Sequence, residues 1–123
     1  MNTEQIAKRL VELCREGKYE QAQQELYADD AVSIEGDGRE AGNITVGMDA
    51  IREKSRQWAA NIVEIHGGSV GEPIVTGNWF SLVMGIDATY KDMGRMAMNE
   101  ICVYHVRDGK IVHEQFFYDM GNA

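Results

Sequence analysis

The sequence predicts an α+β fold in which three N-terminal helices pack on a curved, mainly antiparallel sheet. In the first half of the 123 residues, apolar side chains recur with the 3.6-residue period of helices. In the second half they alternate with polar side chains, as strands require, and tight-turn signals separate the alternating runs. A hydrophobic content of 44% with one proline is typical of a folded chain. The length allows one domain, spanning residues 1–123.

The first two helices are expected before residue 27. Apolar residues at helical spacing follow Asn2 and Thr3, either of which can cap a helix. Gly17 is placed to end that helix in the left-handed conformation. A second, shorter pattern runs from Tyr19 to Leu26. We therefore expect a helix of about four turns followed by a short one.

A short strand and a third helix are expected next. Asp29 and Asp30 compete for turn hydrogen bonds and predict a turn. Residues 31–35 form a strand that is too short to pair alone, so it must add to an edge of the sheet. The four glycines within residues 36–47 predict a loop. The helix after this loop has an apolar face formed by Met48, Ile51, Trp58 and Ile62, and Lys54 is among its solvated positions.

The second half predicts four strand segments. Residues 62–75 hold three glycines and the proline, so this strand is expected to be bent or broken and partly at an edge. Residues 79–91 alternate in polarity, and Asp108-Gly109 is a strong hairpin signal between residues 95–107 and 110–120. The turns place the strand of residues 79–91 between the bent strand and that of residues 95–107. The latter pairs with the last strand.

Charge and cysteine usage exclude several classes of partner. The 20 acidic and 12 basic residues give a net charge of −8 without a basic patch, so neither nucleic acid nor a membrane surface is expected as a partner. No apolar run approaches the roughly 20 residues of a membrane span, and the polar, acidic start favours a cytoplasmic location. Cys14 and Cys102 are expected to be buried thiols. The three histidines lack metal-site spacing, so we expect no metal and no cofactor.

The order of these elements resembles a known family. The two helices are followed by Leu26-Tyr27-Ala28-Asp29-Asp30-Ala31-Val32, a loop, and Gly47 with Ala50-Ile51, and the chain ends in a run from Asn99 to Val112 with Glu114-Gln115-Phe116-Phe117. Over nearly the whole chain this pattern resembles the SnoaL-like branch of the nuclear transport factor 2-like superfamily. The resemblance implies a cone-shaped apolar pocket between helices and sheet, and dimers that pack through the outer sheet face. It implies functions that range from ketosteroid isomerases, polyketide cyclases, dehydratases and epoxide hydrolases to noncatalytic carriers.

Two glutamates stand on otherwise apolar strand faces. Glu100 and Glu114 each share strand parity with apolar neighbours. A carboxylate in such a position is costly to bury unless it is paired, protonated or facing a cavity. Both are therefore candidate catalytic residues in an apolar pocket. The alternative is that one of them lies at the open rim in a salt bridge with Arg95, Arg56 or Lys110.

Glu35 is the third candidate catalytic residue. By the resemblance it falls where ketosteroid isomerases carry their general-base aspartate. The tyrosine and the protonated aspartate of the isomerase oxyanion hole fall at about Leu10 and Cys102, which cannot replace those donors. Steroid isomerase activity is therefore not expected. A lone base could still abstract a proton from an already acidic carbon, as cyclases acting on 1,3-dicarbonyl substrates require.

Six further residues are candidates for the binding wall. Aromatic residues are core residues by default, but a cone-shaped space between helix and sheet needs large side chains to line it. His66 shares parity with Glu64 and is expected to point inward, where it could form an acid–base pair with a carboxylate. The alternative is a surface histidine at a strand end. The candidate binding residues are Trp58, His66, Cys102, Tyr104, Phe116 and Tyr118.

The opposite face of the last two strands is also apolar. Its odd-numbered positions are Ile101, Val103, His105, Ile111, His113 and Phe117. This face is too apolar for open solvent, so we expect a homodimer to form through it.

Two functions remain open at this point. The first is an enzyme of the cyclase, isomerase, dehydratase or hydrolase type, which uses Glu35, Glu100 or Glu114 as a base on a small apolar or cyclic molecule. The second is a noncatalytic ligand-binding or protein-interaction module of the same fold. The absence of a complete catalytic set in the sequence favours the second, and carboxylates on an apolar face favour the first.

Overall fold

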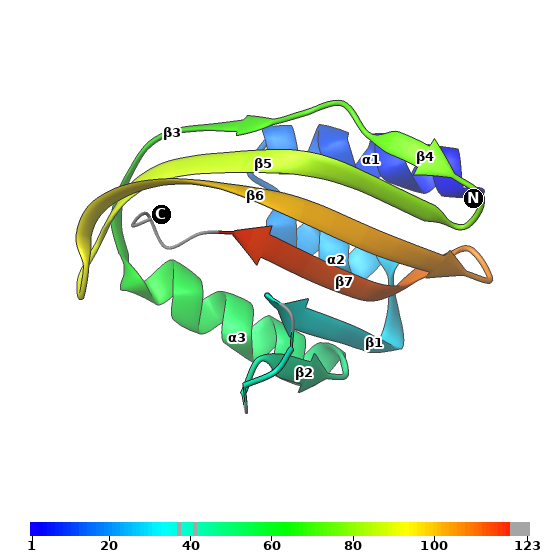
Figure 1. The fold of residues 1–123 in the computed structure, drawn as a ribbon, viewed down its shortest axis with the longest axis horizontal. Coiled ribbons are helices and arrows are strands. Elements are labelled where there is room, and N and C mark those ends of the chain that lie inside the picture. The colour runs from blue at the N-terminus through cyan, green and yellow to red at the C-terminus, as the bar shows by residue number, and fades with distance from the viewer. Residues whose placement is uncertain (37, 41, 119–123) are drawn as a thin grey trace.

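The α+β class is confirmed by a computed structural model, which describes residues 1–36, 38–40 and 42–118. Within this part of the chain, three helices accompany one seven-stranded, mostly antiparallel sheet. Its strands follow the order β2-β1-β7-β6-β5-β3, and β4 pairs separately with β5. Figure 1 shows that β5 and β6 form a long, curved hairpin, with α1 and α2 behind the sheet.

The first two helices begin and end where the sequence predicts. Helix α1 spans Thr3–Arg15, and α2 spans Tyr19–Leu26. The Asn2 side chain accepts a hydrogen bond from the Gln5 backbone N–H at 2.8 Å, and the Gln5 side chain accepts one from the Asn2 N–H at 2.9 Å. This reciprocal pair is a capping box, which satisfies two N–H groups that the helix itself leaves unpaired. At the other end, Gly17 adopts a φ of 73°, a left-handed conformation that glycine adopts without steric cost.

Strand β1 begins before residue 31, where the sequence predicts its start, and this corrects the turn expected at Asp29 and Asp30. It spans Tyr27–Glu35, so Asp29 and Asp30 lie within a strand and not in a turn. Both aspartates are exposed, and the register with β7 is irregular between Tyr27 and Val32. Because this irregularity leaves the aspartates solvated, the strand can continue through them. Tertiary pairing with β7 therefore outweighs their local preference for a turn.

The loop region contains a strand that the glycine pattern hides. Strand β2 spans Ile44–Val46 and pairs antiparallel with β1, whereas β1 pairs parallel with β7. The early strand was expected to add to an edge of the sheet, but β1 lies between β7 and β2, and β2 forms the edge. Helix α3, Met48–Asn61, follows β2, so only two of the three helices precede the sheet.

The apolar face of α3 is only half as long as predicted. Met48 and Ile51 are buried, but Trp58 is 42% exposed. Lys54, which the sequence places on the solvated side, is only partly exposed and forms a partly buried ion pair with Glu35. It follows Ile51 by one turn and therefore lies on the same flank of the helix.

The four strand segments predicted for the second half correspond to five strands in the structure. They are β3 (Ile62–Val70), β4 (Ile74–Thr76), β5 (Trp79–Tyr90), β6 (Gly94–Arg107) and β7 (Lys110–Tyr118). The expected bent strand is the interrupted pair β3 and β4, and β3 shows two register shifts against β5. Residues 119 and 120 of the expected last strand lie outside the described residues.

A bulge in the β6–β7 hairpin corrects the expected outer face. The register shifts between His105 and Val106, so Val106 pairs with Ile111 while His105 pairs with His113. The shift reverses the parity of Ile111, which is fully buried in the core. Ile111 therefore does not belong to the outer face.

The core fills the space between α1, α2 and the inner face of the sheet. Phe80 on β5 and Tyr104 on β6 stack with their ring centroids 4.7 Å apart. Leu10 and Leu13 of α1 are also buried in this cluster. The buried Glu114 on β7 is the register partner of Tyr104 and lies next to it. Further along the same face of β6, Met96 and Met98 are only half-buried. Helix cover is therefore densest at one end of the inner face.

Candidate functional site

Glu114 is the most deeply buried carboxyl group in the described chain. It lies on the inner face of β7 and is 4% exposed. The Tyr27 hydroxyl donates a hydrogen bond to its Oε1 atom, and the Ser33 hydroxyl donates one to Oε2 at 2.7 Å. Burial raises the pKa of Glu114, because it disfavours the charged form, while the two hydroxyl donors oppose the rise. Each oxygen of this carboxyl thus has its own donor.

The parallel pairing of β1 with β7 brings these three residues together. Ser33 is the register partner of Glu114, and Tyr27 lies at the start of the same strand opposite Ile111. Ser33 is fully buried and Tyr27 nearly so. Neither was predicted as a site residue, because the parallel pairing that places both beside Glu114 leaves no local signal in the sequence.

Lys54 supplies a positive charge to this cluster from α3. Its Nζ atom lies 2.8 Å from Ser33 Oγ and 3.1 Å from Glu35 Oε1. The Lys54 side chain is 33% exposed and that of Glu35 is 29% exposed, so the ion pair lies at the boundary between interior and solvent. Ser33 therefore connects the Lys54 ammonium group to the buried Glu114 carboxyl.

Glu100 completes the cluster from the inner face of β6. Its register partners are Tyr118 on β7 and Met84 on β5, and the Cys102 thiol lies 3.8 Å from its Oε1 atom. Burial raises the pKa of Glu100 from its ordinary value of 4.5 to about 7, and the negative charges of Glu35 and Glu114 add to the rise. The thiol and the more distant Lys54 charge only partly oppose it. All three predicted carboxylates thus belong to one electrostatic cluster.

The alternative salt bridges at an open rim are not formed. Arg95 pairs with Asp87 at 3.0 Å, and Arg56 pairs with Glu53 at 3.1 Å. Lys110 donates to the backbone carbonyl of Glu25 at 2.7 Å. The three cations proposed as rim partners are therefore engaged with groups other than Glu100 and Glu114.

Four of the six candidate binding residues border the carboxylates. Phe116 is the register partner of Cys102 and of Glu35, and Tyr118 is that of Glu100. Burial and the negative charge of Glu35 raise the pKa of Tyr118 to about 12. Burial likewise raises the pKa values of Cys102 and Tyr104. The fourth residue, Tyr104, is buried against Phe80 and so contributes to the core.

The other two candidates lie further out. His66 is on β3, where its Nε2 atom lies 2.7 Å from Thr89 Oγ1 and its Nδ1 atom 3.6 Å from an oxygen of Glu64. It therefore meets a carboxylate, but not one of the cluster. Trp58 meets Tyr19 edge to face, with ring centroids 6.4 Å apart. Burial raises the pKa of Tyr19, with smaller contributions from Cys14 and Glu100.

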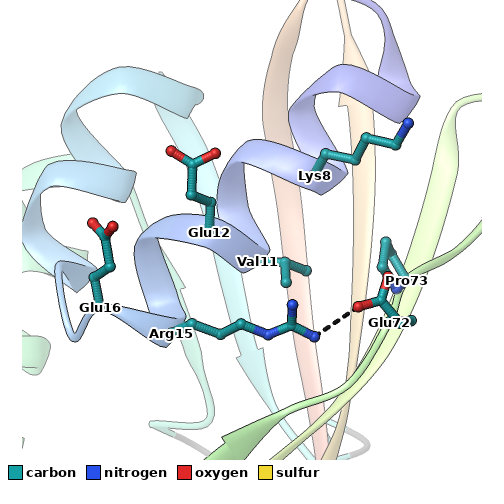
Figure 2. A pocket seen from close by; sticks show the side chains of 7 residues that line it. All are labelled: Lys8, Val11, Glu12, Arg15, Glu16, Glu72 and Pro73. Atoms are coloured by element: carbon teal, nitrogen blue, oxygen red, sulfur yellow. Dashed lines mark hydrogen bonds and ion pairs between the residues drawn. The ribbon is translucent and has the colours of Figure 1, made fainter.

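Two surface hollows lie away from these carboxylates. Figure 2 shows one of them, between α1 and the segment that joins β3 to β4, where Arg15 of α1 pairs with Glu72 at 2.8 Å. The second is lined by residues from the α1–α2 turn and from α2. Within the described residues there is no group of three or more His, Cys, Asp and Glu side chains that could hold a metal ion. None of the described helices combines the length and the apolar character needed to cross a membrane.

Comparison with known proteins identifies the family. The model of the SnoaL-like domain matches residues 1–118. A Mesorhizobium loti structure that carries the provisional name SnoaL-like polyketide cyclase is 39% identical, with a TM-score of 0.89, over 96% of this chain and 100% of that one. No curated protein matches the chain.

More distant structures share the fold alone. A nuclear transport factor 2-like protein of unknown function from Burkholderia pseudomallei is 18% identical, with a TM-score of 0.75, over 97% of this chain and 92% of that one. AclR from Streptomyces galilaeus, provisionally named a hydroxylase, is 13% identical, with a TM-score of 0.72, over 97% and 90%. The family match and the 39% identity over almost the full length of both chains agree with the resemblance seen in the sequence: this protein belongs to the SnoaL-like family.

Proposed function

We propose that this protein binds a small apolar or cyclic molecule at the inner face of its sheet and transfers a proton to or from it through Glu100. The observation that carries the proposal is the setting of the Glu100 carboxyl. It is half-buried on an inner strand face, its nearest donor is a weak thiol, and its pKa is raised to about 7. A carboxyl with such a pKa is present in both its acid and its base form near neutral pH.

The other two carboxylates are less available for proton transfer. Both oxygens of Glu114 already accept hydrogen bonds from hydroxyl groups. Glu35 is paired with Lys54 at 3.1 Å. We therefore assign Glu35 and Glu114 to the electrostatics of the site, because their charges raise the proton affinity of Glu100.

The surroundings of Glu100 favour an apolar ligand. Met96 and Met98 share its strand face, and Met84 lies beside it on β5; all three are half-buried. Methionine side chains adapt their shape and suit the wall of a small-molecule site. The aromatic ring of Phe116 adds to this wall from β7.

The reaction class that fits these groups is proton abstraction from a carbon next to a carbonyl. This step begins both isomerisation and cyclisation of ketones, and it needs a base but no metal or redox cofactor. The provisional name of the Mesorhizobium loti protein includes polyketide cyclase, which is consistent with this class.

The test is hydrogen–deuterium exchange at the α-carbon of cyclic ketones such as cyclohexanone, followed by proton NMR in deuterated buffer. The wild-type protein should accelerate the exchange, and Glu100→Gln should lower the acceleration by about 100-fold or more. Glu64→Gln, which changes an exposed carboxylate on β3, is the matched control and should exchange as wild type does. Equal rates for the wild type and Glu100→Gln would contradict the proposal.

The second candidate is a noncatalytic binding module, favoured by the saturated hydrogen bonding of Glu114. A carboxyl held by two hydroxyl donors can orient a ligand or stabilise the interior without reacting. The same experiment separates the two functions. A ketone that quenches the fluorescence of Trp58 but shows no accelerated exchange identifies a binding module.

We further propose that two copies associate through the outer sheet face. Ile101 is 51% exposed on this face, with Val103, His105, His113 and Phe117 around it. Trp79 from β5 stacks on His105 with ring centroids 4.2 Å apart and is itself partly exposed. Exposed aromatic and aliphatic side chains on three neighbouring strands form the kind of patch that proteins bury in an interface.

A further inference from the structure

The Lys54 ammonium group has an unused hydrogen-bond donor. An ammonium carries three N–H bonds. Two of them are directed to Ser33 Oγ at 2.8 Å and to Glu35 Oε1 at 3.1 Å. No further acceptor for the third is present in the part of the chain that the structure describes. Since the side chain is 33% exposed, a bound molecule can reach this donor.

The two contacts of Lys54 also hold its ammonium group in place. Ser33 is fixed on β1 by its hydrogen bond to the buried Glu114, and Glu35 lies two residues further along the same strand. The Lys54 charge acts on Glu100 as well as on Glu114. The other titratable groups around Glu100 are Tyr19 from α2, Glu35 from β1, Cys102 from β6, and Glu114 and Tyr118 from β7. Among these groups Lys54 is the one that carries a positive charge, and its contacts with Ser33 and Glu35 hold that charge beside the carboxylate cluster.

We infer that Lys54 is a catalytic residue of this site and donates its third N–H to the carbonyl oxygen of a ketone or 1,3-dicarbonyl substrate. The inference rests on the proposed function, which places Glu100 as the base. It supplies the donor that a lone base lacks. The Cys102 thiol, 3.8 Å from Glu100 Oε1, is too weak a donor to stabilise an oxyanion.

The step conserves charge and atoms. A Glu100 oxygen takes the proton from the carbon next to the carbonyl, and the electron pair of that C–H bond forms the carbon–carbon double bond of an enolate. The carbonyl π electrons move to the oxygen, where the Lys54 ammonium stabilises the negative charge. Glu100 then returns the proton to another carbon, or the enolate carbon attacks a second carbonyl, whose π electrons move to its oxygen, and Glu100 returns the proton to the alkoxide so formed. The total charge of the site is the same before and after the transfer.

The test uses 4-nitrophenol as an oxyanion analogue and 4-nitrotoluene as its neutral isostere. Visible absorbance distinguishes bound nitrophenolate from neutral nitrophenol. The wild type should bind nitrophenolate, and Lys54→Met should weaken that binding about tenfold or more, because a hydrogen bond to a charged group is lost. Nitrotoluene should bind to both proteins within about twofold. Lys54→Arg should retain most of the nitrophenolate affinity, and Arg56→Met, from an exposed pair on the same helix, should retain all of it.

A measurement on the unaltered protein covers the case in which Lys54→Met does not fold. The ¹⁵N resonance of the Lys54 side chain should shift when nitrophenol is added and stay in place with nitrotoluene. If nitrotoluene binds but the nitrophenolate affinity does not depend on Lys54, the role of Lys54 is overturned and the proposed site stands. The same holds if nitrotoluene binds but the Lys54 resonance does not move when nitrophenol is added. Failure of both probes to bind the wild type overturns the proposed site and this role with it.

Discussion

Ser33 Oγ lies 2.7 Å from Glu114 Oε2, and this contact joins the buried carboxyl to the half-exposed face of the site. The same oxygen accepts a hydrogen bond from Lys54 at 2.8 Å, so a single hydroxyl couples β1, β7 and α3. A serine hydroxyl can donate one hydrogen bond and accept two, which makes both contacts compatible. The arrangement explains how Glu114 is accommodated at 4% exposure.

Removal of this hydroxyl should destabilise the fold. Ser33→Ala leaves one Glu114 oxygen without its donor in a buried position, which typically costs about 1–3 kcal/mol. Urea unfolding at neutral pH measures the loss. Ser69→Ala, at an exposed position on β3, is the control and should unfold within about 0.5 kcal/mol of the wild type. A Ser33→Ala protein as stable as that control would show that the contact contributes little.

The raised pKa of Glu100 predicts a pH-dependent stability. Because the folded-state pKa is about 7 and the ordinary value is 4.5, the folded state binds the proton more tightly than the unfolded state. The contribution of Glu100 is therefore fully present below the ordinary value and is lost as the pH rises through about 7. The expected loss is on the order of 3 kcal/mol.

Glu100→Gln should abolish that part of the pH dependence. Since glutamine does not ionise, the variant should lose less stability than the wild type when urea unfolding is repeated at several pH values on either side of neutrality. Glu64→Gln should follow the wild-type curve, because Glu64 is exposed. Parallel curves for the wild type and Glu100→Gln would mean that Glu100 titrates normally.

The outer face predicts a change in oligomeric state. Ile101→Lys places a charge at the centre of the proposed interface, where the isoleucine is 51% exposed. The wild type should sediment as a dimer, and the variant should sediment as a monomer or associate at least tenfold more weakly. Gln24→Lys, on the exposed side of α2, adds the same charge elsewhere and should remain dimeric. A wild type that is monomeric at all accessible concentrations would remove the proposed dimer.

Periodicity in the sequence was enough to predict the helices, the hairpins and the strand parity that Glu100 and Glu114 share with apolar neighbours. It worked there because strand parity is strict between regular turns, as at Asp108-Gly109. It was wrong at Ile111, where a bulge reverses parity, and at Asp29 and Asp30, where strand pairing overrides a turn preference. Such irregularities depend on the partner strand, which local patterns do not reveal.

The missing site residues have a similar explanation. Tyr27 and Ser33 reach Glu114 only because β1 lies parallel to β7, more than 80 residues away in the chain. Lys54 could have been recognised, since it follows the buried Ile51 by one helical turn. Its role as a partner of Glu35 depends on how α3 packs against β1, and this packing emerges only in the folded chain.

The proposed function requires Glu100 to exchange its proton near neutral pH. Carbon-13 NMR of protein labelled at the glutamate side-chain carboxyl, with Glu100→Gln to assign the signal, measures this titration directly. We expect a Glu100 midpoint of about 7, well above its ordinary value of 4.5. A midpoint close to 4.5 would contradict it, because Glu100 would then be fully ionised at neutral pH and too weak a base for the proposed proton transfer.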